Sequence, residues 1–287
     1  MNDHSRALAE QGSDAGIPPA GGGGEGTIVA EGVTKEFEGG VVALDDVDLL
    51  ARPGEFVSIV GPSGCGKSTM LRLIAGLIPL SAGTIAVNGR PVTEPRQDVA
   101  LMFQRPTLLP WQTALQNALL PSKLGKTLDQ GAERQAYELL ELVGLSGFEH
   151  TYPRHLSGGM QQRVALARLL MVGVDVLLLD EPFAAVDQLT RERLNLELLR
   201  VHERMSATAL LVTHNIQEAI LLADRVIVMT PRPGRIADVI DVPLPRPRAQ
   251  EMLAEPEFQE LVLRAYSGLQ VPLADPADTR QAGVHGA

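Results

Sequence analysis

Residues 55–76 read EFVSIVGPSGCGKSTMLRLIAG, and this stretch decides the fold. Its centre, residues 61–68, matches the pattern G-x-x-x-x-G-K-[ST] of a phosphate-binding loop. An apolar run precedes the loop and a helical pattern follows it, which is the context that the motif requires. Glycines let backbone N–H groups surround phosphate oxygens, and the following helix adds the positive end of its dipole. The sequence therefore predicts a nucleotide site in which Lys67 reaches the β- and γ-phosphates and Ser68 binds Mg²⁺.

Outward from this loop, short apolar runs alternate with helical patterns over residues 27–243, which is typical of an α/β domain. The runs at 176–179 and 210–212 are apolar without alternation, which indicates strands buried on both faces of a parallel sheet. We therefore expect an α/β fold with strands at 55–60, 100–103, 176–180, 209–213 and 225–229.

The domain organisation follows from composition and from where strands are missing. Residues 1–26 are rich in Gly, Ala and Pro and cannot bury enough apolar surface to order, so they are predicted to be a disordered tail. A segment without convincing strands predicts an α-helical subdomain at about 108–165, inserted into a nucleotide-binding domain of residues 27–245. Residues 246–287 are predicted to hold a helix, at about 250–266, and a polar tail.

Charge and composition exclude several classes of protein. Acidic residues outnumber basic ones 35 to 25, a net charge of −10, which argues against a nucleic-acid binder because such proteins need a basic face. The single cysteine, Cys65, cannot form an intramolecular disulfide and fits a reducing compartment. The N-terminus has no apolar signal segment, and no stretch approaches the ~18 apolar residues that cross a bilayer. We expect a cytoplasmic protein that does not span a membrane.

Two acids, Asp180 and Glu181, end the apolar run at 176–179. Ligands of open α/β sheets bind at this carboxyl edge of the strands. Asp180 is placed to hold Mg²⁺, and Glu181 is placed to orient and polarise the attacking water as a general base. The alternative is a strand that ends in two solvated acids, but the phosphate loop in the same chain favours the catalytic interpretation.

A second glycine-rich turn, Ser157-Gly158-Gly159, precedes the helical run QQRVALARLLM. It predicts another helix N-terminus that can bind an anion. One chain then offers two phosphate sites but only one Lys67 and one acid pair. Taken alone, this motif would be explained equally well as an N-cap with a glycine turn.

Four motifs of this chain resemble those of the ATP-binding cassette (ABC) transporter family and occur in the same order. They are the phosphate loop, LSGGM at 156–160, LLLDEP at 177–182 and His214. The resemblance covers roughly residues 27–243 and implies the ATP-binding subunit of a transporter. It implies a P-loop NTPase fold with a mainly parallel sheet core, flanking helices, an antiparallel β part near the N-terminus and the inserted helical subdomain.

The resemblance also implies a head-to-tail homodimer, in which each ATP lies between Lys67 of one subunit and the Ser157 to Gly159 turn of the other. The residues implied to bind ATP are Phe37, Gly61, Pro62, Ser63, Gly64, Cys65, Gly66, Lys67, Ser68, Thr69, Ser157, Gly158, Gly159 and Asp187. Those implied to bind Mg²⁺ are Ser68, Gln104 and Asp180, and those implied in catalysis are Lys67, Gln104, Glu181 and His214.

Four of these positions depend mainly on the resemblance. Phe37 would stack on adenine, although a half-buried core phenylalanine explains it equally well. Gln104 would contact Mg²⁺ and relay its presence to the membrane subunits. His214 would contact the γ-phosphate, although a lone histidine at a strand end is usually structural. Asp187 would lie in the loop that crosses to the partner subunit.

The chain departs from the family pattern in three places. Met160 ends the signature where the family usually has Gln, Asn215 follows the histidine where Asp is commoner, and the Asp187 loop reads AAVD. None of these changes removes a phosphate, metal or base group, so we expect an active ATPase. Cys65 inside the phosphate loop could be a reactive thiolate, with a small spacer residue as the alternative.

The type of transporter is suggested by looser patterns. A single cassette without membrane spans resembles a bacterial importer component on the cytoplasmic face of the inner membrane, bound to separate permease subunits and indirectly to a solute-binding protein. The segments at 108–111 (LLPW) and 230–236 (TPRPGRI) resemble the nitrate/sulfonate/taurine branch, which implies a small anionic solute. A groove near residues 104–111 would receive a permease helix, although an exposed Trp111 could instead be a core anchor.

The alternative functions of such a chain would require other sequence features. A lipid-handling ABC transporter is the alternative within the same class. ABC ATPases of DNA repair have a long coiled-coil insertion and those of translation have two cassettes, and neither feature is present here. A non-catalytic ATP-binding module would not need Lys67, Asp180, Glu181 and His214 together.

Overall fold

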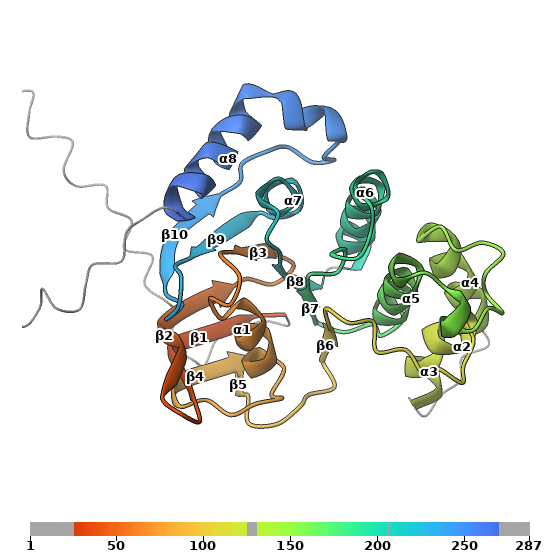
Figure 1. Ribbon diagram of the computed structural model, residues 1–287, viewed down its shortest axis with the longest axis horizontal. Helices are drawn as coiled ribbons and strands as arrows, with labels where there is room; N and C mark the ends of the chain where they lie inside the picture. The colour runs from red at the N-terminus through yellow and green to blue at the C-terminus, as the bar shows by residue number, and fades with distance from the viewer. Residues whose placement is uncertain (1–25, 125–130, 206, 270–287) are drawn as a thin grey trace, which may run out of the picture.

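The computed structural model describes residues 26–124, 131–205 and 207–269 of the chain. The phosphate-loop strand β3 (Phe56–Val60) lies inside a six-stranded sheet with the order β10-β9-β3-β8-β7-β6 (Figure 1). Nearly all of the predicted disordered tail, and the predicted polar C-terminal tail from residue 270, fall outside the described residues.

The six-stranded sheet is parallel except at one edge. Its other strands are β6 (Val99–Met102), β7 (Val176–Asp180), β8 (Thr208–Val212), β9 (Arg225–Met229) and β10 (Ile236–Asp241), and only β10 pairs with its neighbour in antiparallel fashion. Every residue of β3, β7 and β8 is buried, as expected of apolar runs without alternation. The five predicted strands are present, with ends within one residue of the expected ones.

A second sheet is antiparallel and comes from the N-terminal part of the chain. It contains β1 (Ile28–Phe37), β2 (Val41–Ala51), β4 (Ala82–Val87) and β5 (Arg90–Pro91) in the order β2-β1-β4-β5. Helix α1 (Lys67–Ile74) packs between the two sheets, and the side chains of this layer form one hydrophobic core (Figure 1). The predicted fold class, an α/β P-loop fold with an antiparallel part near the N-terminus, is confirmed.

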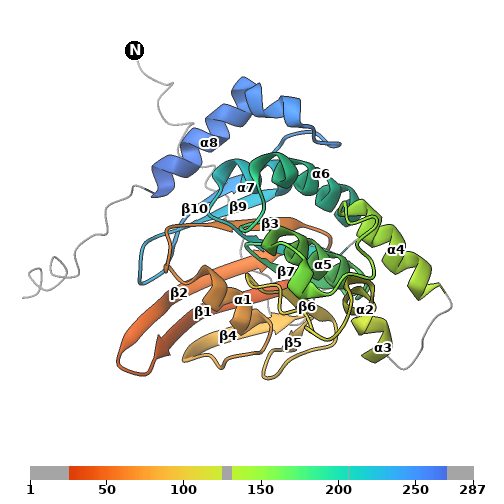
Figure 2. The ribbon, with the colours of Figure 1, turned by 45° about the vertical axis from the view of Figure 1, so that its right-hand side comes forward.

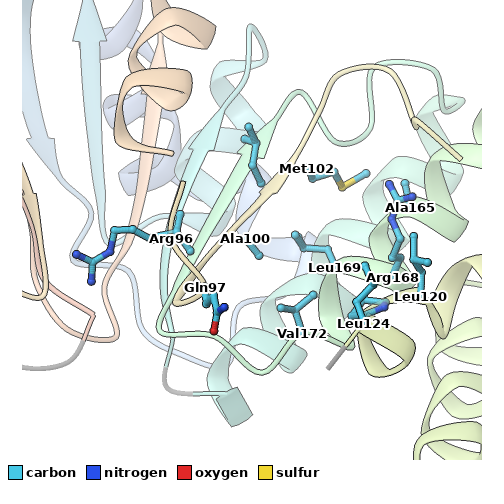
Figure 3. A pocket seen from close by; sticks show the side chains of 13 residues that line it. Arg96, Gln97, Ala100, Met102, Leu120, Leu124, Ala165, Arg168, Leu169 and Val172 are labelled. Carbon is cyan, nitrogen blue, oxygen red and sulfur yellow. The ribbon is translucent and has the colours of Figure 1, made fainter. Parts of the chain in front are cut away.

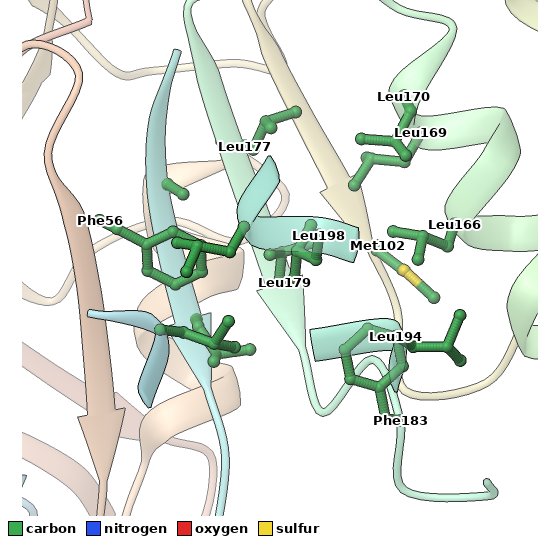
Figure 4. Packing of buried hydrophobic residues seen from close by; sticks show 14 of the residues in the cluster. Phe56, Met102, Leu166, Leu169, Leu170, Leu177, Leu179, Phe183, Leu194 and Leu198 are labelled. Carbon is green, nitrogen blue, oxygen red and sulfur yellow. The ribbon is translucent and has the colours of Figure 1, made fainter. Parts of the chain in front are cut away.

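Helices cover the other face of the six-stranded sheet. They include α5 (Gly158–Leu170), α6 (Gln188–Met205) and α7 (Ile216–Leu222). Figure 4 shows Leu177 and Leu179 of β7 facing Leu166 of α5 and Leu198 of α6 in the second hydrophobic core.

The segment predicted as a helical subdomain holds the short helices α2 (Ala114–Ala118) and α3 (Leu120–Leu124), then α4 (Ala132–Leu142), the 3-10 turn η1 (Pro153–His155) and the start of α5. Helices α2, α3 and α4 lie at the end of the molecule opposite to the β1–β2 hairpin (Figure 2). No strand occurs among the described residues of this segment.

The C-terminal helix differs from the expectation of one helix at 250–266. The chain forms a 3-10 turn, η2 (Gln250–Ala254), and then α8 (Pro256–Leu269). The break is at Glu255, whose backbone is extended, because a residue that precedes proline disfavours the helical conformation. Arg248, ahead of η2, is buried and donates hydrogen bonds to the carbonyls of Ile220, Leu221 and Ala223 at the end of α7, which ties this segment to the domain.

None of the helices in the described part of the chain is long and apolar enough to cross a membrane.

Candidate functional site

A pocket of about 330 Å³ lies at the carboxyl edge of the parallel strands, beside the phosphate loop. Its lining comes from β1, β2, the phosphate loop, the first turn of α1 and the segments that follow β6, β7 and β9. The lining residues are Phe37, Val41, Ala43, Ser63, Gly64, Gly66, Lys67, Ser68, Thr69, Gln104, Glu181 and Arg232. Residues from distant parts of the sequence therefore meet at one cavity.

The backbone of the phosphate loop takes conformations that require glycine. Gly64 and Gly66 have φ angles of +77° and +108°, in the region that L side chains rarely adopt. A Cβ on Gly66 would also lie 2.6 Å from Leu44 Cδ2 and 2.7 Å from the Ala43 carbonyl oxygen. The loop therefore packs closely on β2, and both space and conformation exclude other residues at position 66.

The first residue of α1 is Lys67, whose side chain is only 6% exposed. Its ammonium donates hydrogen bonds to the carbonyls of Gly61 at 2.8 Å and Pro62 at 3.0 Å. The ammonium therefore lies along the loop, against the backbone that would surround the phosphates. Cys65 is buried in the same loop, with its sulfur 3.8 Å from the Lys67 nitrogen.

The next residue, Ser68, links the loop to β7. Its hydroxyl donates to the carboxylate of Asp180 at 2.7 Å. Asp180 is 3% exposed, and burial raises the pKa of its carboxyl, while the Ser68 hydrogen bond and Arg72 act in the opposite direction. Asp180 forms no ion pair with a cationic side chain of the described residues, so a divalent ion would stabilise its buried carboxylate.

These donors fit Mg²⁺. A hydroxyl and a carboxylate oxygen within hydrogen-bond distance are hard ligands, and Mg²⁺ usually takes one or two carboxylates and completes its shell with water and substrate phosphates. No cluster of three or more His, Cys, Asp or Glu that could hold a metal exists among the described residues. This donor set therefore suits an ion that is bound together with a phosphorylated ligand.

Glu181 is held by two side chains from neighbouring strand ends. Its carboxylate accepts a hydrogen bond from the Gln104 amide at 3.0 Å and lies 3.2 Å from Nδ1 of His214. The backbone of Glu181 has a φ of +47°, an unusual value for a non-glycine residue, and its N–H donates to the Val212 carbonyl. Such conformations concentrate at functional sites, where the surrounding structure holds them in place.

Phe37 is the last residue of β1 and is 41% exposed at the mouth of the pocket. The Lys35 ammonium lies 5.1 Å from its ring centre. An exposed aromatic ring that lines a phosphate pocket is able to stack on a base. The adenine contact of Phe37 stays a prediction.

The predicted residues of the second half-site do not line this pocket. Ser157 caps α5 by accepting a hydrogen bond from the N–H of Met160, and it is exposed together with Gly158. Asp187 is exposed and accepts hydrogen bonds from Thr190 at the start of α6, which hold the pKa of its carboxyl below the usual value. Both groups are free to face another molecule.

Sequence reasoning missed three lining residues, Val41, Ala43 and Arg232. Arg232 lies in the TPRPGRI segment, which the sequence marked only as typical of a transporter branch. Its hydrogen bonds to the Gly64 carbonyl join residues 168 positions apart, and no local pattern indicates such a contact.

A larger cavity of about 870 Å³ lies between β6, α3 and α5 (Figure 3). Leu120 and Leu124 of α3, Leu169 and Val172 form an apolar part of its lining. Arg168, also in the lining, donates to the carbonyls of Pro106 and Thr107, in the segment that follows Gln104. The cavity therefore lies beside residues 104–111, where the groove was predicted, and these residues do not line it. Trp111 is 69% exposed and does not anchor a core.

Comparisons with known proteins agree with this geometry. Residues 44–184 match the family model described as ABC transporter. The chain is 44% identical to the nitrate import ATP-binding protein NrtD of Synechococcus elongatus over 227 residues, covering 78% of this chain and 83% of that protein. It is 40% identical to the aliphatic sulfonates import ATP-binding protein SsuB of Bacillus cereus over 248 residues, covering 85% and 98%.

A solved structure of the ATP-binding cassette MJ0796, dimeric, in a post-hydrolysis state and bound to ADP and phosphate, superimposes with a TM-score of 0.68. It is 32% identical in sequence, and the match covers 75% of this chain and 98% of that one. A second dimeric structure of the same cassette gives a TM-score of 0.69.

Proposed function

The chain belongs to the ABC transporter family, and from this premise we propose that it is the ATP-hydrolysing subunit of an importer. The observation that carries the proposal is the convergence of three strand ends on the phosphate pocket. Asp180 ends β7 and accepts a hydrogen bond from Ser68. Glu181, which follows β7, and Gln104, which follows β6, line the pocket together with Lys67, and His214, which follows β8, contacts Glu181.

In the proposed reaction, the phosphate loop binds the nucleotide through its backbone N–H groups, and Lys67 neutralises charge on the β- and γ-phosphates. Glu181 orients the attacking water and accepts its proton. Gln104 and His214 hold the Glu181 carboxylate at the edge of the pocket, so the base is positioned before the substrate arrives.

Ser68 and Asp180 would hold Mg²⁺, and Gln104 lines the same pocket as Ser68. A bound Mg²⁺ supplies charge neutralisation for the transferred phosphoryl group. Gln104 would then report metal binding to the segment that follows it, because Arg168 ties that segment to α5 at the large cavity.

The importer assignment rests on similarity to nitrate and sulfonate import ATP-binding proteins and implies a small anionic solute. We propose that two copies form a homodimer on the cytoplasmic face of the inner membrane. Each copy would dock a permease subunit at the apolar cavity between β6, α3 and α5, and a solute-binding protein would deliver the solute to the permease.

The experiment that tests ATP hydrolysis compares the wild type with Lys67→Ala. Loss of the ammonium removes charge-assisted hydrogen bonds worth about 1.5–3 kcal/mol each, so ATP affinity should fall at least about 10-fold and turnover should be lost. The matched control is Lys123→Ala, which removes the same charge from an exposed position on α3.

Titration with a fluorescent ATP analogue and a phosphate-release assay give the two readouts. Wild-type affinity in Lys67→Ala would contradict the proposed site, and an inactive wild type would contradict the proposed activity.

A further inference from the structure

The segment between β9 and β10, residues 230–235 and here called the β9–β10 loop, lies against the phosphate loop. Nε and Nη2 of Arg232 both donate to the carbonyl oxygen of Gly64, at 3.2 and 3.1 Å. The side chain of Arg232 also lines the nucleotide pocket. No carboxylate lies within salt-bridge distance of Arg232 among the described residues, so its guanidinium is committed to the phosphate loop.

The β9–β10 loop is braced from behind, so Arg232 is held on a fixed support. Gly234 N–H donates to the Ala43 carbonyl at 3.0 Å, and the Gly234 carbonyl accepts from the N–H of Asp45 at 3.1 Å. Arg235 Nε donates to the carboxylate of Asp45 at 3.0 Å. The Thr230 N–H closes the loop by donating to the Arg235 carbonyl. The loop is thereby attached to strand β2.

The contact between the two loops leaves no spare room. A Cβ on Gly234 would lie 2.0 Å from the carbonyl oxygen of Cys65, far inside van der Waals contact. The β9–β10 loop therefore touches two successive peptide groups of the phosphate loop, at Gly64 through Arg232 and at Cys65 through Gly234.

The peptide group between Gly64 and Cys65 is consequently held at both ends. Its N–H, on Cys65, donates to the Pro62 carbonyl at 3.3 Å, and its carbonyl accepts both Arg232 bonds. Gly64 has a φ of +77° and no side chain, so its own backbone offers little resistance to rotation of this peptide. The two Arg232 bonds therefore restrain this peptide from outside the loop, in addition to the Cys65 bond within it.

We propose that Arg232 is a positioning residue of the nucleotide site, which rests on the ATP binding proposed above. Its two hydrogen bonds fix the 64–65 peptide and so preorganise the loop for phosphate before the nucleotide binds. Preorganisation raises affinity because the ordering is already complete in the free protein. The effect concerns the loop itself, so it applies to ATP and ADP alike.

The test measures ATP and ADP affinity in wild type, Arg232→Gln and the matched control Arg200→Gln, which removes an exposed arginine from α6. Arg232→Gln should weaken both nucleotides by the same factor, about 5- to 20-fold, and the loss should persist at high salt. A guanidinium that acted only as a nearby charge would give a loss that fades at high salt, because the Debye length is ~3 Å at 1 M.

Two further variants keep the test decisive if Arg232→Gln folds poorly. Arg232→Lys keeps the charge but loses the two-pronged donor, so its affinity should be intermediate. Gly234→Ala pushes on the Cys65 carbonyl and should also weaken ATP and ADP equally, with Arg232 intact.

The outcomes separate the two claims. Unchanged affinity in Arg232→Gln, full wild-type affinity in Arg232→Lys, or a loss confined to ATP would overturn the positioning role. A wild type that binds neither nucleotide would instead overturn the proposed function.

Discussion

At the scale of single residues, the proposed general-base role of Glu181 can be tested directly by substitution. Its carboxylate is held by Gln104 and lies beside His214, and both contacts survive replacement by an amide of the same shape. Glu181→Gln should keep ATP affinity within a few-fold and lower turnover by about 10²- to 10⁴-fold, because the amide cannot accept the proton of the water. Single-turnover hydrolysis measures the step directly.

Glu133→Gln, a change at an exposed position on α4, is the matched control and should hydrolyse ATP at the wild-type rate. A Glu181→Gln variant that turns over at more than about a tenth of the wild-type rate would contradict a general-base role, which is expected to contribute at least ~10²-fold.

His202 gives the molecule a pH dependence unrelated to the nucleotide site. It is buried on α6 against Phe56, with ring centres 5.0 Å apart. Burial and the nearby Arg246 lower the pKa of His202, and a backbone hydrogen bond at Ala207 together with Asp224 and Glu203 only partly opposes this. The unfolded chain then binds a proton at this residue more readily than the folded chain, so stability is lost as pH falls below about 6.5.

The corresponding prediction is that His202→Phe flattens the decline of unfolding free energy between about pH 7 and pH 5. Denaturant unfolding of the nucleotide-free protein at several pH values measures this slope, and pH 8, at which the imidazole is neutral in both states, gives the reference. An unchanged slope would mean that other groups cause the acid sensitivity.

The sequence predicted the pocket-lining residues that belong to a motif, and it missed those that reach the pocket through contacts of the fold. Lys67 and Ser68 belong to a contiguous pattern with a mechanism of its own. Arg232 could not be assigned from its neighbours, because its partner, Gly64, is brought to it by the pairing of β3 with β9. The positive φ of Glu181 likewise comes from the turn after β7 and from its bond to Val212.

At the scale of elements, Asn215 explains why a departure from the usual aspartate is tolerated. Its side chain accepts a hydrogen bond from the Glu218 N–H and caps α7. Asn215→Ala should lower the unfolding free energy by about 1 kcal/mol, and Asn215→Asp should keep it within a few tenths, because Asn and Asp are similarly good caps. Thermal or denaturant unfolding of the wild type and the two variants measures this difference. Equal stability of all three proteins would mean that the Asn215 cap does not contribute to stability.

The strands were the elements best predicted from sequence, and the reason is their burial. Runs that are apolar on both faces are stable only inside a covered sheet, so β7 and β8 were located to within a residue.

The C-terminal helix was predicted, but its break was not. The pattern of apolar residues continues across Pro256, whereas the helical backbone is interrupted there. The larger cavity was not predicted, because its walls come from three separate elements.

At the scale of the whole molecule, the proposal assigns two separate parts of one chain to phosphate binding. The pocket with Lys67 is lined without any contribution from the Ser157 turn, and Ser157 and Gly158 are exposed at the N-terminus of α5. A helix N-terminus with an exposed glycine turn can bind an anion. In a second copy of the chain, the nucleotide phosphates would be those held in its own Lys67 pocket. Two copies placed head to tail would therefore complete two sites.

The prediction is that Glu181→Gln, which should bind ATP and hydrolyse it slowly, doubles in mass on size-exclusion chromatography with light scattering when ATP and Mg²⁺ are added, but not with ADP. Gly158→Glu in the same background supplies the matched variant. A Cβ at Gly158 meets nothing within 4 Å, and an acid in the first turn suits the helix dipole, so folding and ATP binding by the monomer should be kept. Its carboxylate would nevertheless repel the partner's γ-phosphate, and the double variant should stay monomeric with ATP bound. Dimerisation of the double variant as strong as that of its parent would show that the Ser157 turn is not part of the site. A parent that stays monomeric in saturating ATP would mean that the Ser157 turn needs the permease to close over the nucleotide, or that it has no such role.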